Sequence, residues 1–374
     1  YLSGSKTTAS KESICIDLKS GEGQAIVHQL IAKADVIIHN YRPGVPERLG
    51  IGYEEARAFC PDIIWVSVSG YGPDGPGARR PAAHPIPGAV CGGALLQVGA
   101  GWPPAGLESL DALREASRQC CRANEANPDP NTAVVVAAAT TLALHARRRT
   151  GEGQQVFVTM LGANGYANAD DFLAYAGKPE RPRIDAWLHG TGPLRRLYRA
   201  REGWVCLSVP VDGQEDTRWS ALCAAAERPD LAADARFRDA AARDSHREEL
   251  ASALEALFAT RDADDWERCL LAAGVGCVRA DSYPNAGQFF LHDAQMHANG
   301  FAPVAKHAVL GDYQRWGPLV TFAQTPGRYG PGVLAGEHTA AILAELGCDG
   351  DAVEGLYSRG VVWSQERPQL QPSG

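Results

Sequence analysis

The chain has 374 residues, of which 45% are hydrophobic and 21% are charged, and its formal net charge is −8. This composition is typical of a globular protein large enough for two folded units. The acidic balance argues against a general nucleic-acid-binding protein, which would carry a basic face. The apolar stretches fall short of the ~20 residues of a membrane-spanning helix, so we expect no membrane partner. Ten cysteines without C-x-x-C or zinc spacing predict reduced thiols, no metal site and a cytoplasmic location.

The first part of the chain alternates between strand-like and helix-like patterns. Residues 13–18 and 35–39 are short runs typical of strands, and 63–69 (IIWVSVS) is a clear β-branched strand pattern. Residues 21–34 and 53–60 have apolar side chains at helical spacing. Strand, helix, strand, helix, strand in this order predicts a parallel sheet with helices on its faces.

The next segment has glycines in the spacing of a dinucleotide site. Residues 70–75 (GYGPDG) fit G-x-G-x-x-G directly after a strand. Such a site needs a helix that starts there, but Pro73, Pro76 and Pro81 oppose one, since a proline costs about 3 kcal/mol inside a helix. We therefore predict a loop whose backbone amides approach a ligand, and no NAD.

The rest of the chain predicts further elements and a second unit. Residues 133–149 are an Ala-rich helix pattern with a basic last turn, and 154–159 are a further strand pattern. Strand-like residues 203–209 open a charged, Ala-rich region. The helices expected in that region are 218–227, 245–259 and 263–273. Short strands are expected over 301–324 and a closing helix over 339–347.

Five segments in chain order resemble the class III CoA-transferase family, which includes formyl-CoA transferase, L-carnitine CoA-transferases and α-methylacyl-CoA racemase. The segments are 14–23 (ICIDLKSGEG), 34–53 (ADVIIHNYRPGVPERLGIGY), 67–76 (SVSGYGPDGP), 150–156 (TGEGQQV) and 334–347 (LAGEHTAAILAELG). Any one segment is weak evidence, but five in the right order over nearly the whole chain are specific.

The resemblance implies an α/β fold with two domains. A large domain with a Rossmann-like parallel sheet would take residues 1–190 and the return segment 301–374, and a smaller α+β domain would take 191–300. It also implies a homodimer of interlocked chains, or a fused or heteromeric equivalent. Family members usually begin with a further strand and a segment that helps to hold CoA. This chain starts after it, so we expect the first N-terminal strand to be absent here and to belong to a longer or separate polypeptide.

The resemblance places Asp129 on the catalytic carboxylate of the family. By itself, an Asp before a Pro is typical of a helix N-cap, and the two roles are compatible because a carboxylate at a helix N-terminus stays ionised. In the transferases, this carboxylate attacks the thioester of an acyl-CoA. CoA then passes through an anhydride and an aspartyl-CoA thioester to a carboxylic acid acceptor.

Two alternatives to CoA transfer stay open at this point. The resemblance to the racemase branch pairs His84 with Asp129 as two bases of a 2-methylacyl-CoA racemase. Pro85 stands where the racemases have an acidic residue, so the transferase leads, and His84 is otherwise a loop histidine. Asp216 falls where racemases have an assisting acid, but we expect a solvated surface side chain there. In the second alternative, the chain is a half-subunit that completes the site of another chain.

The resemblance also implies which residues bind coenzyme A, the expected ligand as an acyl-CoA. They are Asn40, Tyr41, Arg42, Arg48, Gly70, Tyr71 and Gly72. The arginines suit phosphates, Tyr41 suits the adenine, and the glycine segment would line the pantetheine channel. Ordinary turn and strand-end positions are the alternative. Residues 189–193 lack the four-glycine run of formyl-CoA transferase, so we do not expect oxalate or formate specificity.

Overall fold

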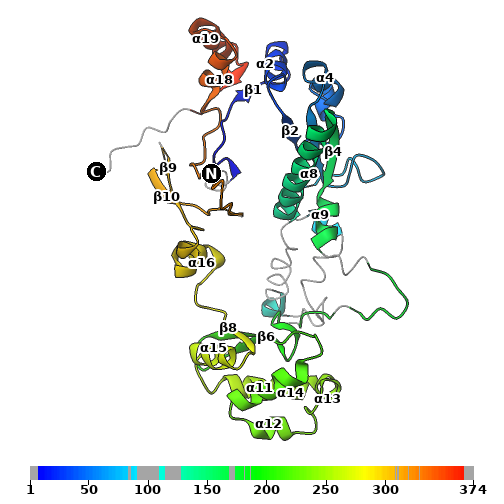
Figure 1. Ribbon diagram of the computed structural model, residues 1–374, viewed down its shortest axis with the longest axis vertical. Helices are drawn as coiled ribbons and strands as arrows, with labels where there is room; N and C mark the ends of the chain where they lie inside the picture. Colours follow the sequence, from blue (N-terminus) through cyan, green and yellow to red (C-terminus); the bar gives the residue numbers. More distant parts are fainter. Residues whose placement is uncertain are drawn as a thin grey trace. The chain divides into compact units, whose positions relative to one another are not determined.

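The computed structural model describes residues 7–82, 86–90, 109–113, 128–167, 173–180, 182–185, 187–307, 309, 311–318, 320–327 and 329–365 (Figure 1). Its contacts divide the chain into two compact units. Unit 1 comprises Tyr1–Ala82, Thr132–Ala163 and Asn285–Gly374, and unit 2 comprises Ala83–Asn131 and Asn164–Pro284. These divisions differ from the domain boundaries that the sequence predicts at 190 and 300, which stay a prediction.

The centre of unit 1 is a parallel sheet in the order β2-β3-β4. The strands are β2 (Val36–His39), β3 (Ile64–Ser69) and β4 (Gln154–Thr159). His39 pairs with Ser67 in the register, and Ser67 pairs with Phe157, so these residues form one row across the sheet. The parallel sheet that the sequence predicts is confirmed.

Helices cover both faces of this sheet (Figure 1). The covering helices are α2 (Gly21–Ile31), α4 (Tyr53–Phe59) and α8 (Pro128–Thr150). Successive side chains of a strand point to opposite faces. Ile64 and Val66 of β3 accordingly pack with Val136 of α8, whereas Trp65 packs with Ile31 of α2 on the other face. The alternation inside one strand therefore specifies a three-layer arrangement.

Helix α8 begins at Pro128, earlier than residue 133, where the sequence pattern places its start. The first N–H groups of a helix have no intrahelical partner, so Pro128 and Pro130 are tolerated in the first turn. Asp129 consequently lies inside the first turn. The prediction that Asp129 is the N-cap residue is wrong for this reason.

The last turn of α8 is fixed to the edge of the sheet where the strands begin. Arg147 forms an ion pair with Asp35 at 2.6 Å and donates to the carbonyl oxygen of Asp62 at 3.3 Å. Asp35 precedes β2, and Asp62 precedes β3. Helix α8 therefore runs antiparallel to the strands, and its unit 1 portion leads from the carboxyl edge of the sheet to the amino edge.

Two glycines join α8 to β4. Gly151 has a left-handed φ of 79° and donates its N–H to the carbonyl oxygen of Arg147, as a helix-ending glycine does. Gly153 lies against the chain before β3, where an added Cβ would come within 2.3 Å of the Asp62 carbonyl group. The sequence TGEGQQV thus has a structural reason for both of its glycines.

Replacement of Gly153 by alanine is expected to lower the free energy of unfolding by about 1–3 kcal/mol, because the clash is with backbone that cannot rotate away. Urea denaturation followed by circular dichroism measures the change. Gly350→Ala is the matched control, since an added Cβ there meets nothing within 4 Å. An unchanged midpoint for Gly153→Ala would contradict the close approach.

Strand β1 (Cys15–Ile16) does not join the parallel sheet, although the predicted strand order placed it there. It pairs antiparallel with β11 (Val362–Trp363). Ile26 of α2 packs with Leu343 and Val353 near the C-terminus, which brings the two ends of the described chain together. Burial against distant residues therefore decides the partner of β1.

Unit 1 contains further elements. Helix α3 (Val45–Arg48) precedes α4. After residue 284, and before β11, the elements are α16 (Ala286–His292), α17 (Ala294–Ala298), β9 (Val304–His307), β10 (Gly311–Gln314), α18 (Thr339–Glu345) and α19 (Gly350–Ser358). The short strands and the closing helix predicted from the sequence are confirmed as β9, β10 and α18. None of the helices in the described part of the chain is both long and apolar enough to cross a bilayer.

Unit 2 contains an antiparallel sheet in the order β5-β6-β7-β8 and a group of helices. The strands are β5 (Gly190–Gly192), β6 (Arg195–Arg199), β7 (Trp204–Ser208) and β8 (Gly276–Arg279). The helices are α5 (Ile86–Val90), α11 (Glu215–Ala225), α12 (Pro229–Ala233), α13 (Ala240–Ser245), α14 (Arg247–Phe258) and α15 (Ala263–Ala272). Helix α9 (Met160–Ala167) continues from β4 and is shared by the two units.

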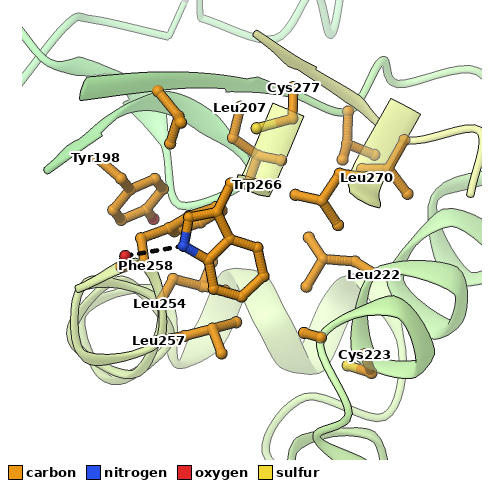
Figure 2. Packing of buried hydrophobic residues seen from close by; sticks show 14 of the residues in the cluster. Tyr198, Leu207, Leu222, Cys223, Leu254, Leu257, Phe258, Trp266, Leu270 and Cys277 are labelled. Carbon is orange, nitrogen blue, oxygen red and sulfur yellow. Dashed lines mark hydrogen bonds between the residues drawn. The ribbon is translucent and has the colours of Figure 1, made fainter. Parts of the chain in front are cut away.

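The core of unit 2 surrounds Trp266, as Figure 2 shows. Leu207 and Cys277 from the sheet and Leu254 and Leu222 from the helices are among the buried residues of this cluster. The predicted strand at 203–209 and the three predicted helices of this region are confirmed. The apolar side chains of these elements pack together in one core.

Candidate active site

The carboxyl edge of the parallel sheet collects most of the predicted CoA-binding residues. Strand β2 ends at His39 and leads directly to Asn40, while β3 ends at Ser69 and leads to Gly70. Parallel strands end at the same edge, and ligands of open α/β sheets bind outside that edge. The structure therefore brings the segments 40–42 and 70–72 to one side of unit 1.

The segment after β2 presents polar groups to solvent. Asn40, Tyr41, Arg42 and Arg48 are all exposed. Gly44, with a left-handed φ of 81°, turns the chain into α3, which holds Arg48 in its last turn. Within the described part of the chain, neither Arg42 nor Arg48 forms an ion pair. Two uncompensated guanidinium groups near a strand end suit an anionic ligand.

The segment after β3 is a loop, as predicted from its prolines. Gly70 and Gly72 are buried and Tyr71 is half-buried, and residues 70–82 contain no helix. An added Cβ on Gly70 would lie 2.1 Å from the Cβ of Ala82, and Gly72 has a left-handed φ of 103°. The close approach of Ala82 therefore favours glycine at position 70, and the left-handed backbone favours glycine at position 72. The dinucleotide fingerprint is a coincidence of spacing, because no helix begins there.

Hydrogen bonds hold this loop against neighbouring elements. The Gly72 N–H donates to Ser69 Oγ at 3.1 Å, and the Leu161 N–H of α9 donates to the carbonyl oxygen of Gly70 at 3.1 Å. A loop fixed in this way can keep a constant path for a bound ligand.

Asp129 lies in the first turn of α8, with its side chain exposed. The same turn is anchored by Asn131, whose side chain donates to Asn164 Oδ1 of α9 at 3.4 Å, and by Thr132, which is buried. The turn is thus held by its neighbours. An exposed carboxylate on a fixed first turn is accessible to a substrate.

The other predicted site residues are His84 and Asp216. His84 lies outside the described residues. Asp216 is in α11 of unit 2, where its carboxylate binds the buried guanidinium of Arg243. Its side chain is 62% exposed, so the predicted surface position is confirmed. Asp216 therefore neutralises the buried charge of Arg243, a structural role that the sequence did not indicate.

A polar pair that sequence analysis missed lies just before the candidate CoA segments. His39 and Ser67 hydrogen-bond at 3.0 Å between Nε2 and Oγ. Burial lowers the pKa of His39 below its usual value, although the negative charge of Glu47 opposes this shift. The sequence contained one signal for this pair: His39 and Ser67 are polar residues near the carboxyl ends of two apolar runs. Such residues can lie in the same row when the two strands pair in parallel. Among the described residues, no group of His, Cys, Asp and Glu side chains is arranged to hold a metal ion.

Comparisons with known proteins place these features in context. The model of CoA-transferase family III matches residues 5–339. An acyl-CoA transferase of Fusarium pseudograminearum is 29% identical over 94% of this chain and 73% of its own length. Succinyl-CoA:glutarate CoA-transferase of Mus musculus is 27% identical over 95% of this chain and 77% of its own. The crystal structure of a CAIB/BAIF family protein from Brucella suis superposes with a TM-score of 0.67 at 25% identity, covering 91% and 82% of the two chains.

Proposed function

Because the chain belongs to CoA-transferase family III, we propose that it moves CoA from an acyl-CoA donor to a carboxylic acid through a covalent intermediate on Asp129. The observation that supports this most is the family match over residues 5–339. The names of several relatives, such as succinyl-CoA:glutarate CoA-transferase, describe the same type of exchange. A dicarboxylate acceptor is the first class to test.

The proposed reaction needs one carboxylate and no net proton transfer. Asp129 attacks the thioester carbonyl carbon of the donor, the C–S bond breaks, and CoA thiolate leaves a mixed anhydride behind. The thiolate attacks the Asp129 carbonyl carbon, which releases the donor acid and forms an aspartyl-CoA thioester. The acceptor carboxylate then attacks this thioester. The released thiolate attacks the acceptor-derived carbonyl carbon of the second anhydride, which frees Asp129. Each step replaces one acyl bond with another, so a difficult exchange becomes four easier ones.

The carboxyl edge of the sheet would bind the nucleotide and the pantetheine arm of CoA. Arg42 and Arg48 would contact phosphates, and Tyr41 would stack on the adenine. The buried glycines at 70 and 72 let a narrow pantetheine chain approach the backbone. Backbone N–H groups in such a segment can also stabilise the oxyanions that form during acyl transfer.

An interlocked dimer, or a fused or heteromeric equivalent, is part of this proposal. Tyr166, Leu173 and Tyr175 are large apolar side chains that are each more than half exposed. Exposed apolar side chains such as these favour packing against another chain.

Trapping the intermediate tests the function directly. The protein is incubated with succinyl-CoA and with other acyl-CoAs, treated with hydroxylamine or borohydride, and analysed by intact mass and peptide mapping. We expect a modification on the peptide that contains Asp129, and none with free CoA alone. The donor that labels fastest identifies the acyl class.

Two other results would redirect the assignment. If no adduct forms and deuterium from D2O enters the α-carbon of 2-methylacyl-CoA, the racemase reaction with His84 and Asp129 replaces CoA transfer. If neither an adduct nor exchange is found, the chain acts as a half-subunit that needs another polypeptide.

A further inference from the structure

The row His39–Ser67–Phe157 crosses the sheet at the last residue of β2 and two residues before the ends of β3 and β4. It lies on the face opposite α8, beyond Trp65, which is buried under α2 and α4. Phe157 is 49% exposed and Tyr41 is 39% exposed. The partly open ring of Phe157 therefore neighbours Ser67 on this face.

The hydrogen bonds of His39 determine which nitrogen carries its proton. The backbone N–H of Tyr41 donates to His39 Nδ1 at 3.3 Å, so this nitrogen is an acceptor. The proton of a neutral imidazole is then on Nε2 and is donated to Ser67 Oγ. Because Ser67 accepts from His39, its own hydroxyl proton points elsewhere and can be donated to a third group.

Ring packing holds the imidazole in this orientation. The His39 ring is stacked on Tyr41 at a centroid distance of 5.9 Å and meets Trp65 at 5.2 Å. Burial also lowers the pKa of His39 below its usual value, which favours the neutral imidazole, although the charge of Glu47 opposes this shift. The imidazole therefore links β2, β3 and the segment that begins at Asn40.

We propose that His39 is a positioning residue for CoA binding: it orients the Ser67 hydroxyl as a donor to an amide carbonyl of the pantetheine arm and fixes the backbone of Tyr41. This inference rests on the proposed function. The pantetheine arm alternates amides with methylene groups, so one hydroxyl donor beside the apolar ring of Phe157 matches its chemistry. Neither His39 nor Ser67 takes part in the covalent steps.

Four variants separate the two hydrogen bonds. His39→Gln can keep the donor to Ser67, since the Gln amide nitrogen reaches the position of Nε2. His39→Asn can keep the acceptor for the Tyr41 N–H, since the Asn oxygen lies near the position of Nδ1. His39→Phe keeps the ring packing and removes both bonds, and Ser67→Ala removes the hydroxyl alone.

The Kd of coenzyme A is measured by isothermal titration calorimetry, and KM and kcat are measured with succinyl-CoA and glutarate. The loss of one hydrogen bond raises the Kd by about three- to tenfold. We expect this increase for Ser67→Ala and for His39→Asn. We expect a larger increase, of about tenfold or more, for His39→Phe, which removes both hydrogen bonds. KM should rise in parallel while kcat stays within about twofold, as for an interaction equally strong in the ground and transition states. The double variant of Ser67→Ala with His39→Asn should bind like Ser67→Ala alone, because both changes remove the same bond.

His338→Asn is the matched control, because His338 Nδ1 also accepts a backbone N–H in unit 1, that of Ser13, at 3.2 Å. It should leave the Kd for CoA unchanged. If wild-type protein binds CoA and the four variants bind it equally well, the inference is overturned and the proposed function stands. If wild-type protein does not bind CoA, both fail.

Discussion

Replacement of Asp129 by alanine is expected to lower kcat for CoA transfer by about a thousandfold or more, because no other group can then form the covalent intermediate. The Kd for CoA should change little, since the carboxylate attacks the thioester carbonyl and does not hold the nucleotide. The loss should therefore appear in kcat and not in KM. Steady-state kinetics with saturating donor and acceptor measure it, and the modified peptide of the trapping experiment should disappear.

Two further substitutions at this position distinguish chemistry from helix stability. Asp129→Asn keeps the shape of the side chain and should be as inactive as the alanine variant. Asp129→Glu keeps the nucleophile but displaces it, which costs about a hundredfold when a reacting group moves by ~1 Å.

Asp351 lies in the first turn of α19, and its replacement by alanine is a matched control for loss of a first-turn carboxylate. The Asp351→Ala variant should retain full turnover. A loss of turnover in this variant would show that removing a first-turn carboxylate affects activity through helix stability alone. Undiminished turnover of Asp129→Ala would exclude both the transferase and the racemase mechanisms.

Replacement of Trp266 by alanine is expected to lower the free energy of unfolding by about 3–5 kcal/mol, the usual loss for an aromatic side chain removed from a core. Trp266 is completely buried, and its Nε1–H donates to the carbonyl oxygen of Phe258 at 2.9 Å (Figure 2). Its ring meets the ring of Phe258 at 5.1 Å, and the guanidinium of Arg261 lies 4.8 Å from its centroid. One side chain thus links α14 to α15.

Urea denaturation followed by far-ultraviolet circular dichroism measures this loss. Trp266→Phe retains an aromatic ring but leaves the Phe258 carbonyl oxygen without this donor, so a smaller loss of about 1–3 kcal/mol is expected. Trp187, also in unit 2, is 71% exposed, and Trp187→Ala is the matched control that should unfold as the wild type does. Equal midpoints for the Trp266 and Trp187 variants would show that this core does not limit stability. Typical domains are stable by only 5–15 kcal/mol, so the expected loss is a large fraction of the total.

The candidate site was predictable in part. The segments 40–42 and 70–72 were predicted because a resemblance marked them and because they follow apolar strand patterns. Their meeting at one edge follows from parallel pairing, which the alternation of strands and helices already indicated. His39 and Ser67 were not predicted, since nothing local shows that two residues on different strands share a row.

The sequence by itself determined the elements whose apolar spacing is local. Strand β3, helix α2 and helix α15 lie close to their predicted ranges, because burial of one face imposes a period on neighbouring residues. Gly151 of TGEGQQV belongs here too, since a helix end favours a left-handed residue that glycine supplies.

Only the tertiary structure decided the pairings between distant residues. The pairing of β1 with β11, the ion pair of Asp216 with Arg243 and the bond of His39 with Ser67 join side chains that no periodic pattern connects. A local pattern specifies which face of an element is buried, and the surfaces available in the folded chain specify what buries it.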